Sequence, residues 1–313
     1  MARGVFKLPL ENGRKELAWY AGRQVVNGTN QLNPVIPLKV ERDADFVAKR
    51  IFLVQWPSSD ATLALPPQTT VTLRDGTSKR GLSLVPQAAT NICNASPVRM
   101  ISAFLGLAAP YLIKANNFIY AEISNPGAGA TAWAGDLYLV AEGFKIYPNQ
   151  PEEFPATISQ YAIPYVLNGN AQIGDPTGPA SNVAGQFIQI TNAGEGKLLA
   201  KGMRLRITDA AGLDKTDALM PYLAFAVKDT TSGSKTWNQD TSQDATFPLI
   251  PSAIWTMGQT FLPFNTPRYI DPNGVISVQV IWPAIAAARA TVSGLAAWPV
   301  VMSVEFVGGL LPR

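Results

Sequence analysis

Apolar and polar residues alternate along several short stretches of the chain. Met203, Leu205 and Ile207 are each followed by a polar residue, which is the period-two pattern of a strand with one buried face. The same alternation recurs in the segments Thr70–Arg74, Ile276–Trp282 and Met302–Phe306. The 25 glycines and 25 prolines are spread along the sequence and divide it into short segments, which disfavours long helices.

The remaining expected elements fit the same class. Further strands are predicted at Val35–Val40, Phe46–Gln55, Phe118–Ser124, Asp136–Ile146, Phe187–Thr191 and Leu223–Lys228. Short helices are predicted at Val98–Leu107, Lys215–Met220 and Ala284–Thr291, between strands, as in the loops of a β-sandwich. The sequence therefore predicts an all-β protein.

The middle of the chain is typical of a linker. The segment Tyr147–Pro155 carries three prolines and two adjacent acids, and it follows one predicted strand and precedes further β pattern. We therefore expect a first domain at 1–148 that begins with an N-terminal arm, a linker at 149–155, and a second domain at 156–313.

A weak internal repeat relates the two predicted domains. Asn116, followed by an alternating strand, resembles Asn273, and Gly143 in the last strand of the first half resembles Gly308 in the last strand of the second. Each half has room for six to nine strands. These features predict two tandem jelly-roll-like β-sandwiches, an architecture of about eight strands per domain.

Composition narrows the range of functions. The 313 residues contain no histidine and one cysteine, Cys93, so triads with a histidine base and the common histidine-based metal sites are excluded. Charged residues make up 15% against about 25% in an average soluble domain, and hydrophobic residues make up 47%. We expect a structural or binding protein rather than an enzyme, and no cofactor. The sparse charge is typical of surfaces that face other subunits.

Candidate chemical motifs are weak. Asp43-x-Asp45 has two carboxylates for a cation but no EF-hand spacing. The adjacent acids Glu152 and Glu153 point to opposite sides of an extended chain and cannot act together on one bond. Basic residues never form a run longer than two, so no specific nucleic-acid contact is predicted. No stretch of 18 uninterrupted apolar residues predicts a membrane span.

Tryptophans are the strongest candidates for contact residues. Trp56 and Trp298 each precede a proline at a predicted strand exit, where they could fill a barrel end or contact a neighbouring subunit. Trp237 lies in a long polar loop, where it could anchor an interface, stack on a sugar or fold back on the barrel. With Trp19, these four residues are the interface candidates.

Residues 16–148 resemble small jelly-roll proteins encoded among the structural genes of tailed phages and prophages. The resemblance is carried by three stretches: Arg42-Asp43-Ala44-Asp45-Phe46, Thr70-Val71-Thr72-Leu73-Arg74-Asp75 with Arg80-Gly81-Leu82, and Leu139–Tyr147 after the strand Phe118–Ile123. The tandem organisation is also similar to the double jelly-roll capsid subunits of tailless icosahedral phages, an analogy of length, class and repetition. Both resemblances imply a virion protein.

The expected function is therefore a capsid shell subunit that acts by self-assembly, with itself as homotrimer and with other virion proteins as partners. The resemblance to double jelly rolls implies localisation in the virion, after assembly in the cytoplasm of a bacterial host. Two alternatives stay open: a cement or minor capsid protein of a tailed-phage head, and a pair of carbohydrate-binding modules in a receptor-binding apparatus.

Overall fold

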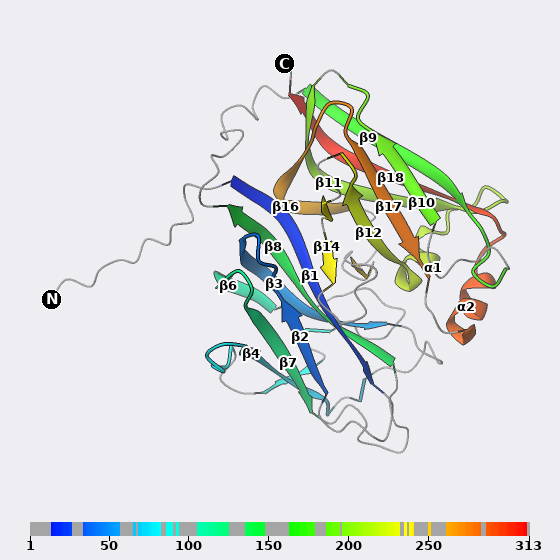
Figure 1. Ribbon diagram of the computed structural model, residues 1–313. Helices are drawn as coiled ribbons and strands as arrows, with labels where there is room; N and C mark the ends of the chain where they lie inside the picture. The colour runs from blue at the N-terminus through cyan, green and yellow to red at the C-terminus, as the bar shows by residue number, and fades with distance from the viewer. Residues whose placement is uncertain are drawn as a thin grey trace.

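A computed structural model describes most of the chain and consists almost entirely of strands (Figure 1). The described residues are 14–26, 34–56, 65–66, 68–82, 86–89, 92–93, 105–124, 135–147, 163–178, 186–194, 196–231, 235–236, 238–240, 250–251, 261–282 and 286–311. The predicted linker at 149–155 and the arm before residue 14 lie outside them.

Two sheets come from the first half. Their strands are β1 (Arg14–Val26), β2 (Val35–Lys39), β3 (Asp45–Trp56), β4 (Thr70–Asp75), β5 (Gln87–Ala88), β6 (Leu105–Ile113), β7 (Phe118–Ser124) and β8 (Gly135–Tyr147). Sheet I has the order β1-β8-β3-β6 and sheet II the order β2-β7-β4-β5, and their facing sides enclose one apolar core. We call this unit the first sandwich.

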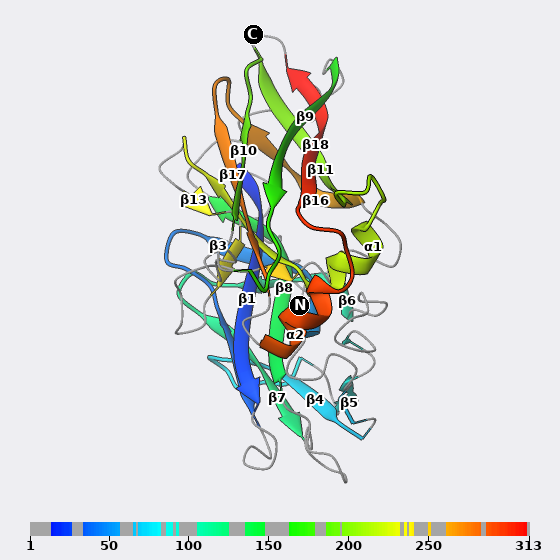
Figure 2. The same ribbon diagram turned by 90° about the vertical axis from the view of Figure 1, so that its right-hand side faces the viewer.

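Two further sheets come from the second half and form the second sandwich (Figure 2). Its elements are β9 (Ile163–Ile173), β10 (Gln186–Thr191), β11 (Lys197–Thr208), α1 (Thr216–Leu219), a 3-10 turn (Met220–Tyr222), β12 (Ala224–Asp229), β13 (Lys235–Thr236), β14 (Asn238–Asp240), β15 (Ile250–Pro251), β16 (Phe261–Ile270), β17 (Val275–Ile281), α2 (Ala286–Ser293) and β18 (Val300–Leu311). Sheet III has the order β9-β18-β11-β16 and sheet IV the order β10-β17-β12-β13, with β15 beside β12. The remaining strand, β14, joins sheet I.

The two sandwiches share one strand order, since β9, β18, β11 and β16 follow each other as β1, β8, β3 and β6 do. The turns agree as well. Asn116 before β7 and Asn273 before β17 both have a positive φ, of 64° and 58°, which asparagine tolerates better than most residues. The backbone N–H of Asn116 donates a hydrogen bond to the carbonyl of Glu41, just after β2. The backbone N–H of Asn273 donates one to the carbonyl of Asn192, just after β10. The repeat expected from Asn116 and Asn273 is thus present in the backbone.

A β-bulge marks the same place in both sandwiches. The register of β3 shifts between Ala48 and Arg50, and that of β11 shifts between Ala200 and Gly202. Gly143 lies opposite Ala48, and Gly308 lies opposite Ala200. At either glycine a Cβ would collide with a carbonyl oxygen of the bulged strand, so only glycine fits. These landmarks let us match residues of one sandwich to those of the other.

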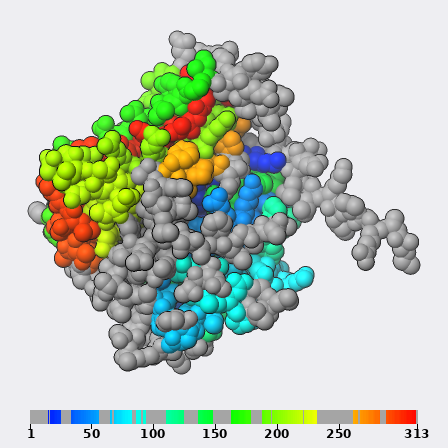
Figure 3. Space-filling model, turned by 180° about the vertical axis from the view of Figure 1, so that it is seen from behind, coloured from blue at the N-terminus to red at the C-terminus, as the bar shows by residue number. Residues whose placement is uncertain are grey.

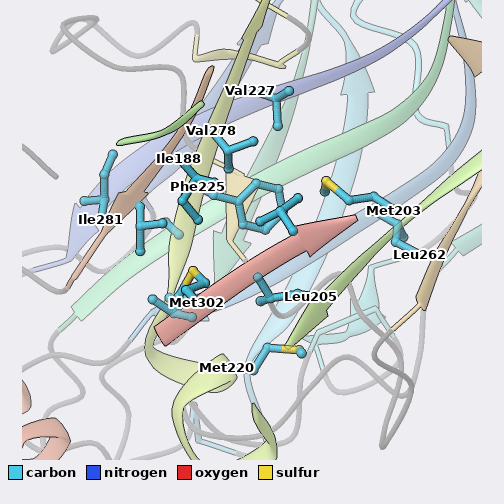
Figure 4. Close-up of a cluster of buried hydrophobic side chains, with 14 of the residues drawn as sticks. Ile188, Met203, Leu205, Met220, Phe225, Val227, Leu262, Val278, Ile281 and Met302 are labelled. Atoms are coloured by element: carbon cyan, nitrogen blue, oxygen red, sulfur yellow. The ribbon is translucent and has the colours of Figure 1, made fainter. Parts of the chain in front are cut away.

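The core of the second sandwich lies between sheets III and IV (Figure 4). Met203, Leu205 and Ile207 of β11 are at most 4% exposed. Arg204 and Arg206 between them point outward, with side chains 50% and 67% exposed. The alternation that the sequence shows at this strand is therefore confirmed.

The expected elements agree with the structure except in one place. The six further strands and the helices at 215–220 and 284–291 coincide with β2, β3, β7, β8, β10, β12, α1 and α2 to within a few residues. The helix expected at Val98–Leu107 is wrong in its described part, because residues 105–107 belong to β6, which pairs with β3. The sequence also gave no signal for β1 or β9.

Candidate functional site: the two faces of the repeated sheet

The outward face of sheet I is covered by the second sandwich. Trp19, Phe52, Val54, Tyr138 and Val140 project from this face, and none is more than 3% exposed. They belong to the same apolar cluster as the core of the second sandwich, whereas the inward face of sheet I packs on sheet II. Sheet I is thus buried on both sides. The two sandwiches cover different regions of the surface in space-filling view (Figure 3), and the outward side chains of sheet I join them in one core.

One aromatic contact lies at the centre of this shared core. The ring of Trp19 on β1 meets the ring of Phe264 on β16 edge to face, with 5.7 Å between centroids, a favourable geometry for an aromatic pair. Trp19 was expected at an interface between subunits. It lies instead at the interface between the two sandwiches of one chain, where it is 1% exposed and therefore closed to any partner in this fold.

A short strand from the second half completes sheet I. Strand β14 pairs in parallel with the free edge of β1, with Trp19 opposite Asn238 and Ala21 opposite Asp240. The long polar loop that contains Trp237 therefore supplies backbone to the first sandwich. The domain boundary at 148–156 stays a prediction, but the two units are joined by this strand as well as by the shared core.

The matching face of sheet III carries charged side chains at the corresponding positions. Phe52 pairs with Val140 across β3 and β8, and Arg204 pairs with Glu305 across β11 and β18. Counted from the bulge and the matched glycines, these two pairs occupy the same position in their sandwiches. Arg204 and Glu305 form an ion pair at 3.1 Å on the open surface, and Arg206 reaches Asp214 at 3.4 Å. The same position in the fold thus carries an apolar pair where it is covered and an ion pair where it is open.

Strand β9 combines an open edge with exposed apolar side chains. It pairs with β18 on one side, and none of the described strands pairs with its other side. Ile163 and Val166 on this strand are 60% and 50% exposed, among the most exposed large apolar residues in the described part of the chain. A long strand edge with apolar side chains is a template for pairing with another strand.

The other predicted interface tryptophans divide into two groups. Trp298 is half-buried, packs edge to face on Trp282 with 5.7 Å between centroids, and donates its indole N–H to the carbonyl of Ser293. It links the end of α2 to the core of the second sandwich. The side chain of Trp56 and all of Trp237 lie outside the described residues, so their expected role stays a prediction.

The acids singled out in the sequence bind basic groups of the same sandwich. Asp43 accepts hydrogen bonds from Lys145 and Tyr147, and Asp45 accepts one from the ammonium group of Lys114 at 2.8 Å. Lys145 is 6% exposed, and its ammonium group lies 2.9 Å from Asp43. A buried charge needs such partners. The groups anchor the start of β3 to the end of β8. No cluster of three metal-ligating side chains occurs in the described ranges.

Burial also changes the protonation of a neighbouring phenol. Tyr20 on β1 is fully buried beneath Lys145, whose ammonium group lies 5.8 Å from the ring centroid. Loss of solvent, reinforced by the charges of Glu41 and Asp43, raises the pKa of Tyr20 far above its ordinary value. This phenol stays neutral and cannot act as a base, so it has a packing role.

The second sandwich encloses one small cavity. It measures about 10 Å³ and is lined by apolar side chains, among them Met203, Phe225 and Val278. A space of this size holds at most one water molecule, which would find no polar partner there. The cavity is a packing defect of the core rather than a ligand site. The surfaces of sheet III are therefore the best candidates for function.

Comparison with known proteins adds no family. No protein-family model and no curated protein sequence matches the chain. Among solved structures, one similar chain is a protein of Eubacterium rectale provisionally described as secreted, with 13% identity over 93% of this chain and 75% of that chain and a TM-score of 0.20. Another is a fucolectin from striped bass (Morone saxatilis) serum, with 10% identity over 92% and 86% and a TM-score of 0.23. Scores this low carry no functional conclusion. No helix among the described residues is long and apolar enough to cross a membrane.

Proposed function

We propose that this protein is a structural subunit of a virion shell, made of two tandem jelly rolls and acting by self-assembly. The observation that carries the proposal is the repeated strand order. Four strands ordered β1-β8-β3-β6 face four ordered β2-β7-β4-β5, and the second half repeats both orders. Two facing four-stranded sheets with crossing connections are the jelly-roll arrangement, which is common in viral capsid and lectin domains.

Two surface properties favour assembly over ligand binding. The described part of the chain holds an apolar cavity too small for a ligand, whereas β9 offers an open edge with exposed isoleucine and valine. The outer face of sheet III combines exposed apolar side chains such as Val166 and Val301 with charged ones such as Arg204. Contacts between already folded proteins are of this mixed kind, with about the same apolar fraction as the rest of the surface. In this proposal the homotrimer is the building block, the partners are other copies and other virion proteins, and the virion is the location.

The proposal predicts that purified full-length protein associates as its concentration rises. Sedimentation velocity over a wide concentration range should show species heavier than the 33.6 kDa monomer, increasing at the expense of the monomer. Low ionic strength should weaken an association that brings like charges together and strengthen one that pairs opposite charges, so the series is repeated at several salt concentrations. A single monomer boundary under all conditions would contradict self-assembly. Small discrete oligomers that never grow would favour a minor or cement role.

A further inference from the structure

The two sandwiches differ in what lies against the edge of their first strand. In the first sandwich the edge of β1 is paired with β14, a segment of the second sandwich. In the second sandwich none of the described strands pairs with the corresponding edge of β9. The structure therefore shows how this edge is covered in the first sandwich, and no described strand covers the same edge in the second.

The correspondence can be set residue by residue. Ala18 pairs with Gly143, and Tyr165 pairs with Gly308. Because the two glycines match, Trp19 corresponds to Val166. A second landmark agrees: a Cβ at Gly22 would collide with the backbone of β2, and one at Gly169 would press on the backbone of β10. Gly22 follows Trp19 by three residues and Gly169 follows Val166 by three residues. Strands β1 and β9 thus approach the neighbouring sheet at matching positions.

The matched residues have opposite exposure. Trp19 is 1% exposed because the second sandwich packs on its side of sheet I, whereas Val166 on the uncovered face of sheet III is 50% exposed. Ile163, which is 60% exposed, lies three residues earlier and therefore on the opposite side of β9. An apolar residue thus stands where the covered sandwich has its tryptophan, and Val307, its partner on β18, is apolar too, whereas Arg204 and Glu305 further into the face are charged. The apolar pair of Val166 and Val307 therefore lies at the margin of the sheet where a strand would be added.

From this difference we propose that a second copy of this chain adds a strand to β9 at Ile163–Asn168, in the way that β14 is added to β1. Strand β14 comes from the connection between β12 and β16, and the matching connection in the first sandwich is residues 76–104, between β4 and β6. Within this connection Gln87–Ala88 pair with β4 and Cys93 bridges to Leu53 in their own sandwich. The added segment would therefore come from the remaining residues of 76–104 of the neighbouring copy. The inference rests on the proposed self-assembly.

The geometry of such a contact follows from its origin. The contact joins the second sandwich of one copy to the first sandwich of the next. Each copy therefore donates a strand from its first sandwich and accepts a strand at β9 of its second. Head-to-tail contacts of this kind close into rings or continue as filaments. Backbone hydrogen bonds of an added strand supply affinity, and the side chains at alternate positions supply specificity. The mixed apolar and charged face around β9 suits a contact that forms after folding.

A matched pair of variants tests the contact. Val166→Lys places a charge on the proposed edge, and Val35→Lys places the same charge on β2, where Val35 is 45% exposed in the first sandwich. We expect V166K to weaken association by roughly tenfold or more, the effect of losing a central contact residue. V35K should associate like the wild type. Circular dichroism and thermal unfolding verify that both variants fold.

A photo-crosslinking amino acid at position 166 then identifies the partner segment. Mixing ¹⁴N- and ¹⁵N-labelled protein before irradiation distinguishes contacts between copies from contacts within one copy. The inference expects mixed-isotope crosslinks to peptides within 76–104. Crosslinks to residues 1–13, crosslinks within one copy only, or equal losses in V166K and V35K would overturn it. If the wild type associates and V166K associates equally, the edge contact fails and self-assembly stands. A wild type that stays monomeric overturns both.

Discussion

Residues 1–148, produced without the second half, are expected to aggregate rather than to fold as a stable domain. Removing the second sandwich exposes the outward face of sheet I, including Trp19, Phe52 and Tyr138. Burial of each such side chain contributes about 1.5–3 kcal/mol, so the exposed face costs on the order of 10 kcal/mol, comparable with the whole stability of a domain. Solubility and near-ultraviolet circular dichroism of the fragment measure the outcome.

The second sandwich supplies the control for this experiment. At the positions that match Phe52 and Val54 it has Arg204 and Arg206, which lie open to solvent. The fragment 1–148 with Phe52→Arg and Val54→Arg should therefore be more soluble than the unmodified fragment. The same two changes in the full-length chain should be strongly destabilising. A wild-type fragment that is soluble, monomeric and cooperatively folded would contradict the shared core.

Trp19→Ala is expected to lower the free energy of unfolding of the full-length protein by about 3–5 kcal/mol, the usual cost of truncating a fully buried tryptophan. The side chain lies between the sandwiches against Phe264, so its loss should also weaken their coupling. Thermal unfolding followed by calorimetry should therefore change from one transition in the wild type to two resolved transitions in W19A.

Two variants calibrate this result. The indole N–H of Trp19 has no hydrogen-bond partner among the described residues, so Trp19→Phe keeps the ring, removes an unsatisfied donor and should cost much less than W19A. Trp298→Ala removes a half-buried ring that packs on Trp282 within the second sandwich and should lower stability without uncoupling the two sandwiches. If W19A unfolds in one transition with the stability of the wild type, Trp19 does not join the two units.

Much of the fold was predictable because many strands are buried on one face only. Strand β11 alternates between Met203, Leu205 and Ile207 inside and two arginines outside, and the period is plain in the sequence. Strand β1 was missed for the opposite reason. Residues 17–22 are all buried, because one face meets sheet II and the other meets the second sandwich, and a strand buried on both faces does not alternate.

Burial of sheet I on both faces is also visible in the sequence as unbroken apolar runs, which a search for alternation does not detect. Ile51, Phe52, Leu53 and Val54 form an unbroken apolar run in β3, as residues 137–141 do in β8, and all are buried. The matching strands β11 and β18 alternate. Comparing matched strands of the two halves would have indicated which sheet is covered on both sides.

The assembly surface could not be predicted from local pattern. Strand β14 is three residues long, lies in a polar loop and pairs with β1 more than 200 residues earlier. Pairing at this separation depends on the packing of the two sandwiches rather than on local propensity. Strand β9 was missed because its centre is Asn168-Gly169-Asn170, a sequence more typical of a turn. Its open edge became visible only beside the covered edge of β1.

Electron microscopy of the associated full-length protein tests the central proposal most directly. The double jelly-roll shell predicts flat, roughly hexagonal trimers in which six sandwiches alternate around a central axis, and closed shells or curved sheets of these units at high concentration. Fields that contain only monomers, or only shapeless aggregates, at every concentration and salt condition would contradict a shell-forming function.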